Sequence, residues 1–276
     1  MITRSAFATL RLNRRALSLV MCSVLAACAG APSAPPAPVA ELAPAGTLRA
    51  AINFGNQILA VKDAVTGEPH GVSVDLAREL GRRLGVPVEL ITFDAAGKVV
   101  EAVKAAQVDI AFVAIDSVRG ADMLQTTPYV IIEGAYLVKN DSPIKSNAEV
   151  DRTGNRIAIG HGSVYDLYLT REVKAATLVR AQTSPAVVDF FLAQGLEVAA
   201  GVKQQLQLDA KRLPGLRLLD GRFMVIQQAM GLPKGREAGA RYLTAFVEEM
   251  KASGFVAAAL ARHGIEGAAV APPAVP

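Results

Sequence analysis

The sequence predicts an α/β fold, because strand-like and helix-like segments alternate along most of its 276 residues. Short runs with the apolar or alternating pattern typical of strands occur at 47–56 (GTLRAAINFG), 86–93 (VPVELITF) and 108–115 (VDIAFVAI). Between them, 71–86 and 96–106 carry apolar residues at helical spacing. Strands and helices that alternate in this way are typical of βαβ units, so we expect a mostly parallel sheet.

The patterns inside these segments also predict burial. The segment 71–86 is expected to begin as a short strand and to continue as an amphipathic helix, because its apolar residues from Val74 to Leu84 fall on roughly one face. The run 108–115 is apolar almost throughout, which is typical of a strand covered on both faces.

The same alternation restarts further along the chain and predicts a second lobe. Its strand-like and helix-like segments are 155–173, 177–181, 184–195, 196–202 and 216–220. We interpret the extended stretches 136–143 and 223–231 as two crossings between the lobes. The last segment, 235–264, is expected to form one long helix that ends at Gly264.

Two crossings make the first lobe discontinuous. We expect it to comprise 47–138 and 226–267, with 139–225 as the second lobe. About 220 ordered residues are enough for one large domain or two small ones.

The net charge of +4 is concentrated near the amino terminus. Arg4, Arg11, Arg14 and Arg15 precede residue 28, and no Asp or Glu does. Removing these four from the 29 Lys and Arg leaves 25, which balances the 25 Asp and Glu. A nucleic-acid partner is therefore not expected, since such a surface needs a clustered surplus of Lys and Arg.

Residues 1–27 have the features of a signal peptide: the arginines are followed by an apolar run that is too short to span a membrane. The end of this segment, Leu25-Ala26-Ala27-Cys28, resembles the bacterial lipobox, which implies lipid attachment at Cys28. An ordinary cleavage site with an incidental cysteine is the alternative.

The remaining terminal segments are rich in Pro and Ala. Residues 28–46 are expected to form an extended tether, and 268–276 a disordered tail. Cys22 lies in the segment to be removed and Cys28 would carry lipid, so the folded part has no thiol for a disulfide or a metal site.

An ordered series of motifs gives the sequence a family resemblance. GVSVDLARELGRRLGV, VDIAF…DSVR, TTPYV, VKNDSPIKSNAEVD, RIAIGHGS and the ASGF helix resemble, in order and spacing, the extracellular solute-binding proteins of ABC importers, specifically the polar amino-acid group. The resemblance covers approximately residues 46–265 and implies a type II periplasmic binding protein, with two α/β lobes, two hinge strands and a ligand held between the lobes.

The resemblance also implies a function and a location. A periplasmic protein, anchored to a membrane of the cell envelope through Cys28, would capture a small carboxylate-bearing solute, an amino acid, and deliver it to an ABC permease in the inner membrane. We expect a monomer without a metal or other cofactor.

Arg119 lies at the position where the family places the arginine that binds the ligand α-carboxylate. Its planar guanidinium suits this role because it offers two parallel hydrogen bonds and stays charged. A surface arginine paired with Asp116 or Asp122 is the alternative. The location also fits the rule that open α/β sheets bind ligands beyond the carboxyl ends of their strands.

Asp116 stands where the family usually has threonine, whereas Val198 stands where family members commonly carry an aspartate for the α-ammonium. One hypothesis is that Asp116 binds the ammonium from the first lobe. The other is that Asp116 only neutralises Arg119, which leaves a ligand that is no ordinary α-amino acid.

The second lobe contributes the turn IGHGSVYDL. Free backbone N–H groups at a helix start can bind an anion, and in the family this turn reaches the ligand carboxylate. Gly162 and Ser163 are therefore expected to face Arg119 across the cleft, although a plain capped helix explains the same residues.

Other candidate ligand-binding residues follow the strands of both lobes. Phe54 is expected to pack on the ligand side chain, or else to lie in the core, while Asn53 and Asn56 could donate hydrogen bonds. Lys203 could extend into the pocket from the second lobe. The two glutamines at 227–228 interrupt an apolar strand, and we expect them to form hydrogen bonds with neighbouring backbone rather than with ligand.

Two other functional classes stay open. The fold also hosts secreted enzymes such as cyclohexadienyl dehydratases, so a lyase acting on a bound carboxylate is an alternative, although the sequence contains no nucleophile elbow or phosphate-binding loop. A solute-sensing envelope lipoprotein is the other.

Overall fold

The structure is a computed structural model that describes residues 36–274. Its first-lobe strands are β1 (Leu48–Asn53), β2 (Val61–Lys62), β3 (Pro69–His70), β4 (Val88–Phe93) and β5 (Ile110–Ala114). The second-lobe strands are β7 (Arg156–Gly160), β8 (Thr177–Ala181), β9 (Val198–Val202) and β10 (Leu216–Leu218). The connecting strands β6 (Met123–Lys139) and β11 (Met224–Pro233) and the short β12 (Ala269–Val270) complete the set in this part of the chain.

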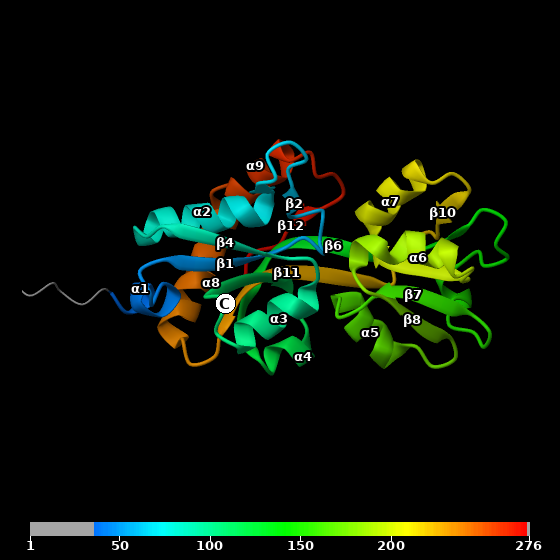
Figure 1. Cartoon of the computed structure of the whole chain (residues 1–276), viewed down its shortest axis with the longest axis horizontal. Helices are drawn as coiled ribbons and strands as arrows, with labels where there is room; N and C mark the ends of the chain where they lie inside the picture. Colours follow the sequence, from blue (N-terminus) through cyan, green and yellow to red (C-terminus); the bar gives the residue numbers. More distant parts are fainter. Residues whose placement is uncertain (1–35, 275–276) are drawn as a thin grey trace, which may run out of the picture. The chain divides into compact units, whose positions relative to one another are not determined.

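All of these strands except the β2–β3 hairpin form one mixed sheet, with the order β4-β1-β5-β11-β6-β9-β7-β8. β1 pairs in parallel with β4 and β5, and β7 pairs in parallel with β8 and β9. The prediction of an α/β fold with two lobes is confirmed, because each lobe has its own parallel strands and the antiparallel pair β6 and β11 joins them (Figure 1).

Helices lie on both sides of the sheet in each lobe (Figure 1). Those of the first lobe are α1 (Ala37–Leu42), α2 (Val72–Leu84), α3 (Ala96–Lys104), α4 (Ser117–Gly120), α8 (Glu237–Ala252) and α9 (Phe255–Arg262). Those of the second are η1 (Asn147–Glu149), α5 (Val164–Glu172), η2 (Ser184–Ala186), α6 (Val187–Ala193) and α7 (Lys203–Arg212).

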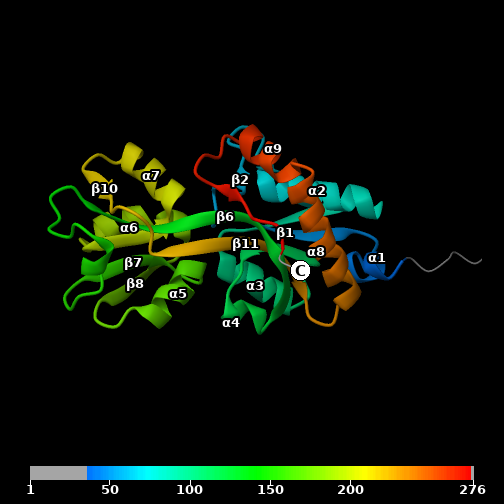
Figure 2. The same ribbon diagram turned by 180° about the vertical axis from the view of Figure 1, so that it is seen from behind.

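The long strand β6 belongs to both lobes. Its first part pairs with β11 on one edge and with β12 on the other, whereas its last residues pair with β9 and β10 (Figure 2). The crossing expected at 136–143 is therefore the end of a strand that begins at Met123. β11 agrees with the second expected crossing.

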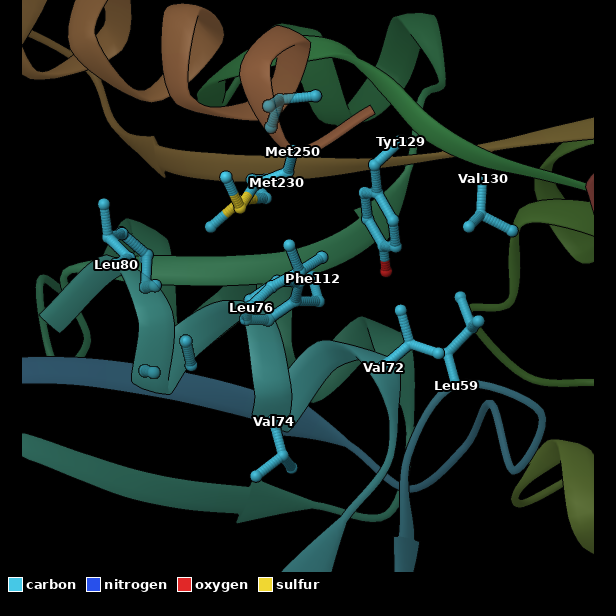
Figure 3. Close-up of a cluster of buried hydrophobic side chains, with 14 of the residues drawn as sticks. Leu59, Val72, Val74, Leu76, Leu80, Phe112, Tyr129, Val130, Met230 and Met250 are labelled. Carbon is cyan, nitrogen blue, oxygen red and sulfur yellow. The ribbon is translucent and has the colours of Figure 1, made fainter. Parts of the chain in front are cut away.

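Separate hydrophobic clusters stabilise the two lobes. In the first, Leu76 and Leu80 of α2 pack with Phe112, Tyr129 and residues of β11 and α8 (Figure 3). In the second, the main clusters lie between the β7–β9 strands and helices α5 and α6. β5 is buried along its whole length, as its apolar run predicts.

Two expected elements differ from those in the structure. The expected short strand before α2 is absent, because Val72–Asp75 already form the first helical turn, with Asp75 N donating to Gly71 O at 3.0 Å. The expected long carboxyl-terminal helix is two helices, α8 and α9, because Gly254 between them has a left-handed φ of 79°.

Both terminal segments are more ordered than expected. Within the expected tether, Ala37–Leu42 form α1, which packs on α8 through the buried Leu42, and Glu41 Oε2 accepts from Gly239 N at 2.7 Å. Within the expected disordered tail, β12 pairs with β6, and Ala271 is buried. Apolar surface on α8 and the free edge of β6 explain why these segments fold back. Residues 1–35, including Cys28, lie outside the described residues.

A buried acid stabilises the first lobe at the end that lies away from the second lobe. The carboxylate of Asp109 is fully buried and pairs with Arg49 and Arg236, each at 2.9 Å. It thereby joins the start of β5 to β1 and to the segment before α8. In residues 36–274 no helix has the length and apolar character needed to cross a membrane.

Candidate ligand-binding site

Arg119 lies on the short helix α4, immediately after β5 ends. Its side chain turns back into the molecule, and the residue is only 3% exposed. Nη1 donates to Ala114 O at the end of β5, and Nη2 donates to Gly162 O in the β7–α5 turn of the second lobe, both at 3.0 Å. The guanidinium therefore links the two lobes.

A cavity of about 30 Å³ lies beside this guanidinium. Its first-lobe lining is Asn53, Gly55, Asn56, Ala96, Ala114, Arg119 and Gln228, and its second-lobe lining is Ser163, Val164, Tyr165, Ser184 and Val202. The cavity follows the carboxyl ends of β1, β5 and β9, where open α/β sheets place their ligands. Arg119 is thus directed into an inter-lobe cavity and not outward to solvent.

The electrostatics of Arg119 favour an anion. Burial lowers the pKa of Arg119 to about 10, and the nearby charge of Asp116 acts in the opposite direction. The guanidinium therefore stays protonated at neutral pH. Within residues 36–274 its hydrogen bonds go to carbonyl oxygens, and no carboxylate lies in ion-pair range of it. A buried cation without a paired anion is favourable for binding a carboxylate.

Asp116 does not line the cavity, although its charge acts on the nearby Arg119. Its Oδ1 accepts from Val118 N at 2.9 Å and caps α4, and its Oδ2 pairs with Arg171 of α5 at 2.8 Å. It is not among the residues that line the cavity. The physical reason is its position as N-cap, which directs the carboxylate toward the start of α4 and across to α5. Asp116 therefore forms an ion pair between the lobes.

The Gly162–Ser163 turn meets Arg119 as expected, but with different groups. Ser163 is the N-cap of α5, lines the cavity and accepts from Asp166 N at 3.0 Å. Gly162 presents its carbonyl to Arg119, while its N–H donates to Asp166 Oδ2 at 2.9 Å. The Gly162 N–H is therefore not available to an anion in this structure, because Asp166 accepts its hydrogen bond.

The start of α5 still offers backbone donors. The first N–H groups of a helix have no partner within the helix. Val164 and Tyr165, the first two residues of α5, both line the cavity. An anion bound to Arg119 would therefore lie near a helix amino terminus.

The residues after β1 are divided between the cavity and the core. Asn53 and Asn56 line the cavity, and Asn53 Oδ1 accepts from Gly55 N at 2.9 Å. Phe54 is half-buried against the first-lobe core and is not among the residues that line the cavity, so its contact with a ligand stays a prediction. Consecutive side chains of an extended chain point to opposite faces, which is why Asn53 and Phe54 separate.

Lys203 is likewise not among the residues that line the cavity. Its ammonium pairs with Glu133 of β6 at 2.9 Å, and the preceding Val202 lines the cavity instead. Val198, the position considered for an ammonium-binding acid, is fully buried in the second-lobe core. An acid at that position would lie away from the cavity.

Sequence reasoning missed three polar lining residues: Gln228, Tyr165 and Ser184. Gln228 is 6% exposed, and its polar side chain in an otherwise apolar strand was the available signal. Tyr165 and Ser184 carried no motif. Burial raises the pKa of Tyr165, while the hydroxyls of Ser184 and Ser163 act in the opposite direction.

In the described part of the chain, no group of three or more His, Cys, Asp or Glu side chains is arranged to hold a metal ion. The cavity lining is one cation, several neutral hydrogen-bonding groups and small apolar side chains. Such an arrangement can bind and orient a small carboxylate.

Comparison with solved structures supports the fold assignment. A mutant of ArgBP from T. maritima has 18% identity and a TM-score of 0.72, covering 83% of this chain and 100% of that chain. An ancestral amino acid-binding protein described as a precursor of cyclohexadienyl dehydratase has 19% identity and a TM-score of 0.70, covering 81% and 98%. A Wolinella succinogenes DSM 1740 ABC-transporter binding component, solved with lysine, has 21% identity and a TM-score of 0.68, covering 79% and 95%. At these identities the likeness concerns the fold.

A search of curated proteins finds no match. By contrast, the profile of one family matches residues 59–265, which include the second lobe, both connecting strands, most of the first lobe and every residue that lines the cavity except Asn53, Gly55 and Asn56. The chain therefore belongs to the bacterial extracellular solute-binding proteins, family 3.

Proposed function

We propose that this protein captures a small carboxylate-bearing solute, an amino acid, between its lobes and delivers it to the permease of an ABC importer. The observation that carries the proposal is Arg119, a buried cation that faces an inter-lobe cavity and has only carbonyl partners within residues 36–274. Membership of an extracellular solute-binding family supports the transport role.

Binding begins when a carboxylate accepts hydrogen bonds from the Arg119 guanidinium on the first lobe. In the present structure the Gly162 carbonyl accepts from Nη2 across the lobes, so separation of the lobes frees this N–H for the ligand. As the lobes approach, the amino terminus of α5 brings the N–H groups of Val164 and Tyr165 to the same anion. Only a ligand that gains contacts from both lobes stabilises the closed form relative to the open one.

The two lobes, 47–138 with 226–267 and 139–225, move about β6 and β11 in this proposal. The hydrophobic clusters follow this division in the main: Val164 of α5 is the one buried second-lobe residue in the first-lobe cluster, and the clusters of the second lobe take in only the end of β6, residues 135–138, from the first. Lobe closure around a ligand is a frequent form of conformational change in binding proteins.

The structural neighbours favour an amino acid as the solute. One neighbour is an ABC-transporter component in complex with lysine, and another is an ancestral amino acid-binding protein. The latter is also a precursor of a dehydratase, so the lyase alternative is tested by incubating the protein with cyclohexadienyl substrates and measuring aromatic product.

The protein acts at the cell envelope in this proposal, anchored by lipid on Cys28. The lipobox-like sequence before Cys28 supports the anchor. Expression of Cys28→Ser should release the protein from membranes into the soluble periplasmic fraction. A wild-type amino-terminal peptide whose mass lacks acyl chains would contradict lipidation.

The binding role is tested by a thermal-shift screen of amino acids, each paired with the amine that lacks the carboxylate, such as L-lysine with cadaverine and L-arginine with agmatine. A ligand at a hundredfold excess over its Kd stabilises by about 2.7 kcal/mol. The acid of a pair should raise the melting temperature and the amine should not.

Variants then locate the carboxylate. Arg119→Met should weaken binding of the acid by about thirtyfold or more, since loss of a buried charged hydrogen bond costs about 2–5 kcal/mol. Arg119→Lys keeps the charge but loses the planar guanidinium, so its affinity for the acid should lie between those of the wild type and Arg119→Met. Arg82→Met is the control, because Arg82 is 71% exposed and pairs with Glu79 on α2. A loss below tenfold in Arg119→Met would contradict the proposal.

A further inference from the structure

A second, smaller cavity adjoins the one beside Arg119. Its volume is about 10 Å³, and it shares Gly55, Asn56, Tyr165, Ser184 and Val202 with the first. From there it extends along α7 of the second lobe to Gln205 and Asp209. Its walls come from both lobes, so its size depends on how far the lobes are separated.

This second cavity contains hydrogen-bond acceptors that lack donors. Asn56 Oδ1 and Gln205 Oε1 are buried and have no hydrogen-bond partner within residues 36–274. The orientation of the Gln205 amide is fixed, because its nitrogen donates to Asp209 Oδ2 at 3.3 Å and a carboxylate can only accept. Gln205 Oε1 is therefore an acceptor in need of a donor, and leaving it unpaired is unfavourable.

Asp209 adds a negative charge to these acceptors. The residue is 5% exposed, and its Oδ1 accepts from Arg212 at 3.0 Å. Arg212 is half exposed and also pairs with Asp189, so it neutralises Asp209 only in part. Within the described residues, Oδ2 accepts only the long bond from Gln205.

The rest of the lining is mainly aliphatic, with Ile58, Val187, Val188 and Leu206 along the walls. Asn56 lines both cavities, whereas Gln205 and Asp209 line only the second, so a ligand that extends from Arg119 to α7 contacts aliphatic side chains as well as acceptors. The two cavities together therefore combine one cation, aliphatic side chains, and unpaired oxygens beside an acid.

We propose that the ligand carries a cationic nitrogen group at the end of an aliphatic chain remote from its carboxylate, and that Asn56, Gln205 and Asp209 bind that group. This inference rests on the proposed function, because Arg119 must hold the carboxylate. Both a basic α-amino acid and an ω-amino acid without an α-ammonium have this chemistry. The carboxylate of Asp116 pairs with Arg171, and within residues 36–274 no acid lines the cavity beside Arg119, so the site does not require an α-ammonium.

Calorimetric titration with matched probes tests the inference. L-lysine is compared with L-norleucine, and 5-aminopentanoate with pentanoate; the members of each pair differ only in the terminal amine. In at least one pair the terminal amine should strengthen binding about tenfold or more, because a charged hydrogen bond in a buried site is a strong one. The pair that responds tells whether the natural ligand has an α-ammonium.

Two variants then locate the terminal group. Gln205→Leu and Asp209→Asn should each reduce the preference for the amine about fivefold or more, while the affinity of the uncharged probe changes little. Gln207→Leu, on the exposed face of the same helix, should leave both affinities unchanged. A purely structural role of these residues would weaken both members of a pair equally.

The possible failures are distinguishable. If both members of a pair bind equally and Arg119→Met abolishes both, the remote cation site is overturned and the carboxylate site stands. If the amine preference persists in both α7 variants, these residues do not form the site. If none of the four probes binds at millimolar concentration, the remote-cation inference is overturned, and the wider amino-acid screen then decides the proposed function on its own.

Discussion

Arg171 of the second lobe and Asp116 of the first form an ion pair at 2.8 Å, and its removal should shift the protein toward an open form. The Asp116 side chain is 3% exposed and that of Arg171 is 43% exposed. Exposed pairs contribute about 0–1 kcal/mol, whereas breaking a buried pair costs about 3–5 kcal/mol. The present pair lies between, so Arg171→Met should disfavour closure by about 1–2 kcal/mol.

Because the carboxylate of Asp116 is solvated when the lobes separate, this cost falls on the closed form alone. The apparent Kd of the best amino-acid ligand should therefore rise about five- to thirtyfold. Calorimetry measures the affinity, and small-angle X-ray scattering with and without ligand should show less compaction at equal ligand concentration. Arg152→Met is the control, since Arg152 is 62% exposed and pairs with Glu149 inside one lobe. Unchanged affinity and scattering in Arg171→Met would refute the reasoning.

Three further predictions concern packing and pH. Gly97 and Gly162 meet across the lobes, because a Cβ on Gly162 would lie 3.2 Å from Gly97 Cα. Gly97→Leu should therefore obstruct closure. Calorimetry should show ligand binding weakened about tenfold or more, with little change in the melting temperature of the free protein. Deletion of 269–276 exposes the edge of β6 and should lower the melting temperature by several degrees in calorimetric scans; an unchanged value would mean that the tail contributes nothing. Burial alone would raise the pKa of Asp109, but the hydrogen bonds from its two arginine partners hold this pKa below its ordinary value. The contribution of Asp109 to the free energy of unfolding is therefore present above about pH 4 and lost as the pH falls through the lower folded pKa. In urea unfolding, the stability of Asp109→Asn should depend less on acid pH than that of the wild type, and an equal dependence on pH in both proteins would count against this.

The fold was predictable where local pattern determines structure. The apolar run of β5, the amphipathic pattern of α2 and the alternation of strand and helix lie in single segments of sequence, and each is present in the structure. The terminal segments were not predictable, because α1 and β12 form only where α8 and β6 offer a surface and an edge. Composition alone describes such segments as tether or tail.

The candidate site shows the same division. Arg119 and Ser163 follow strands at recognisable positions, and both line the cavity. Tyr165 and Ser184 reach it only through the packing of the second lobe, for which the sequence carries no local signal. Lys203 does not line the cavity because Glu133, distant in sequence, lies close enough to pair with it.

A crystal structure with the tightest ligand from the acid and amine screen tests the central claim most directly. The account predicts that a ligand carboxylate oxygen accepts from the Arg119 guanidinium in the inter-lobe cavity, and that the Gly162 carbonyl no longer accepts from Nη2. A ligand bound elsewhere, with Arg119 still donating only to Ala114 and Gly162 as in the present structure, would contradict it.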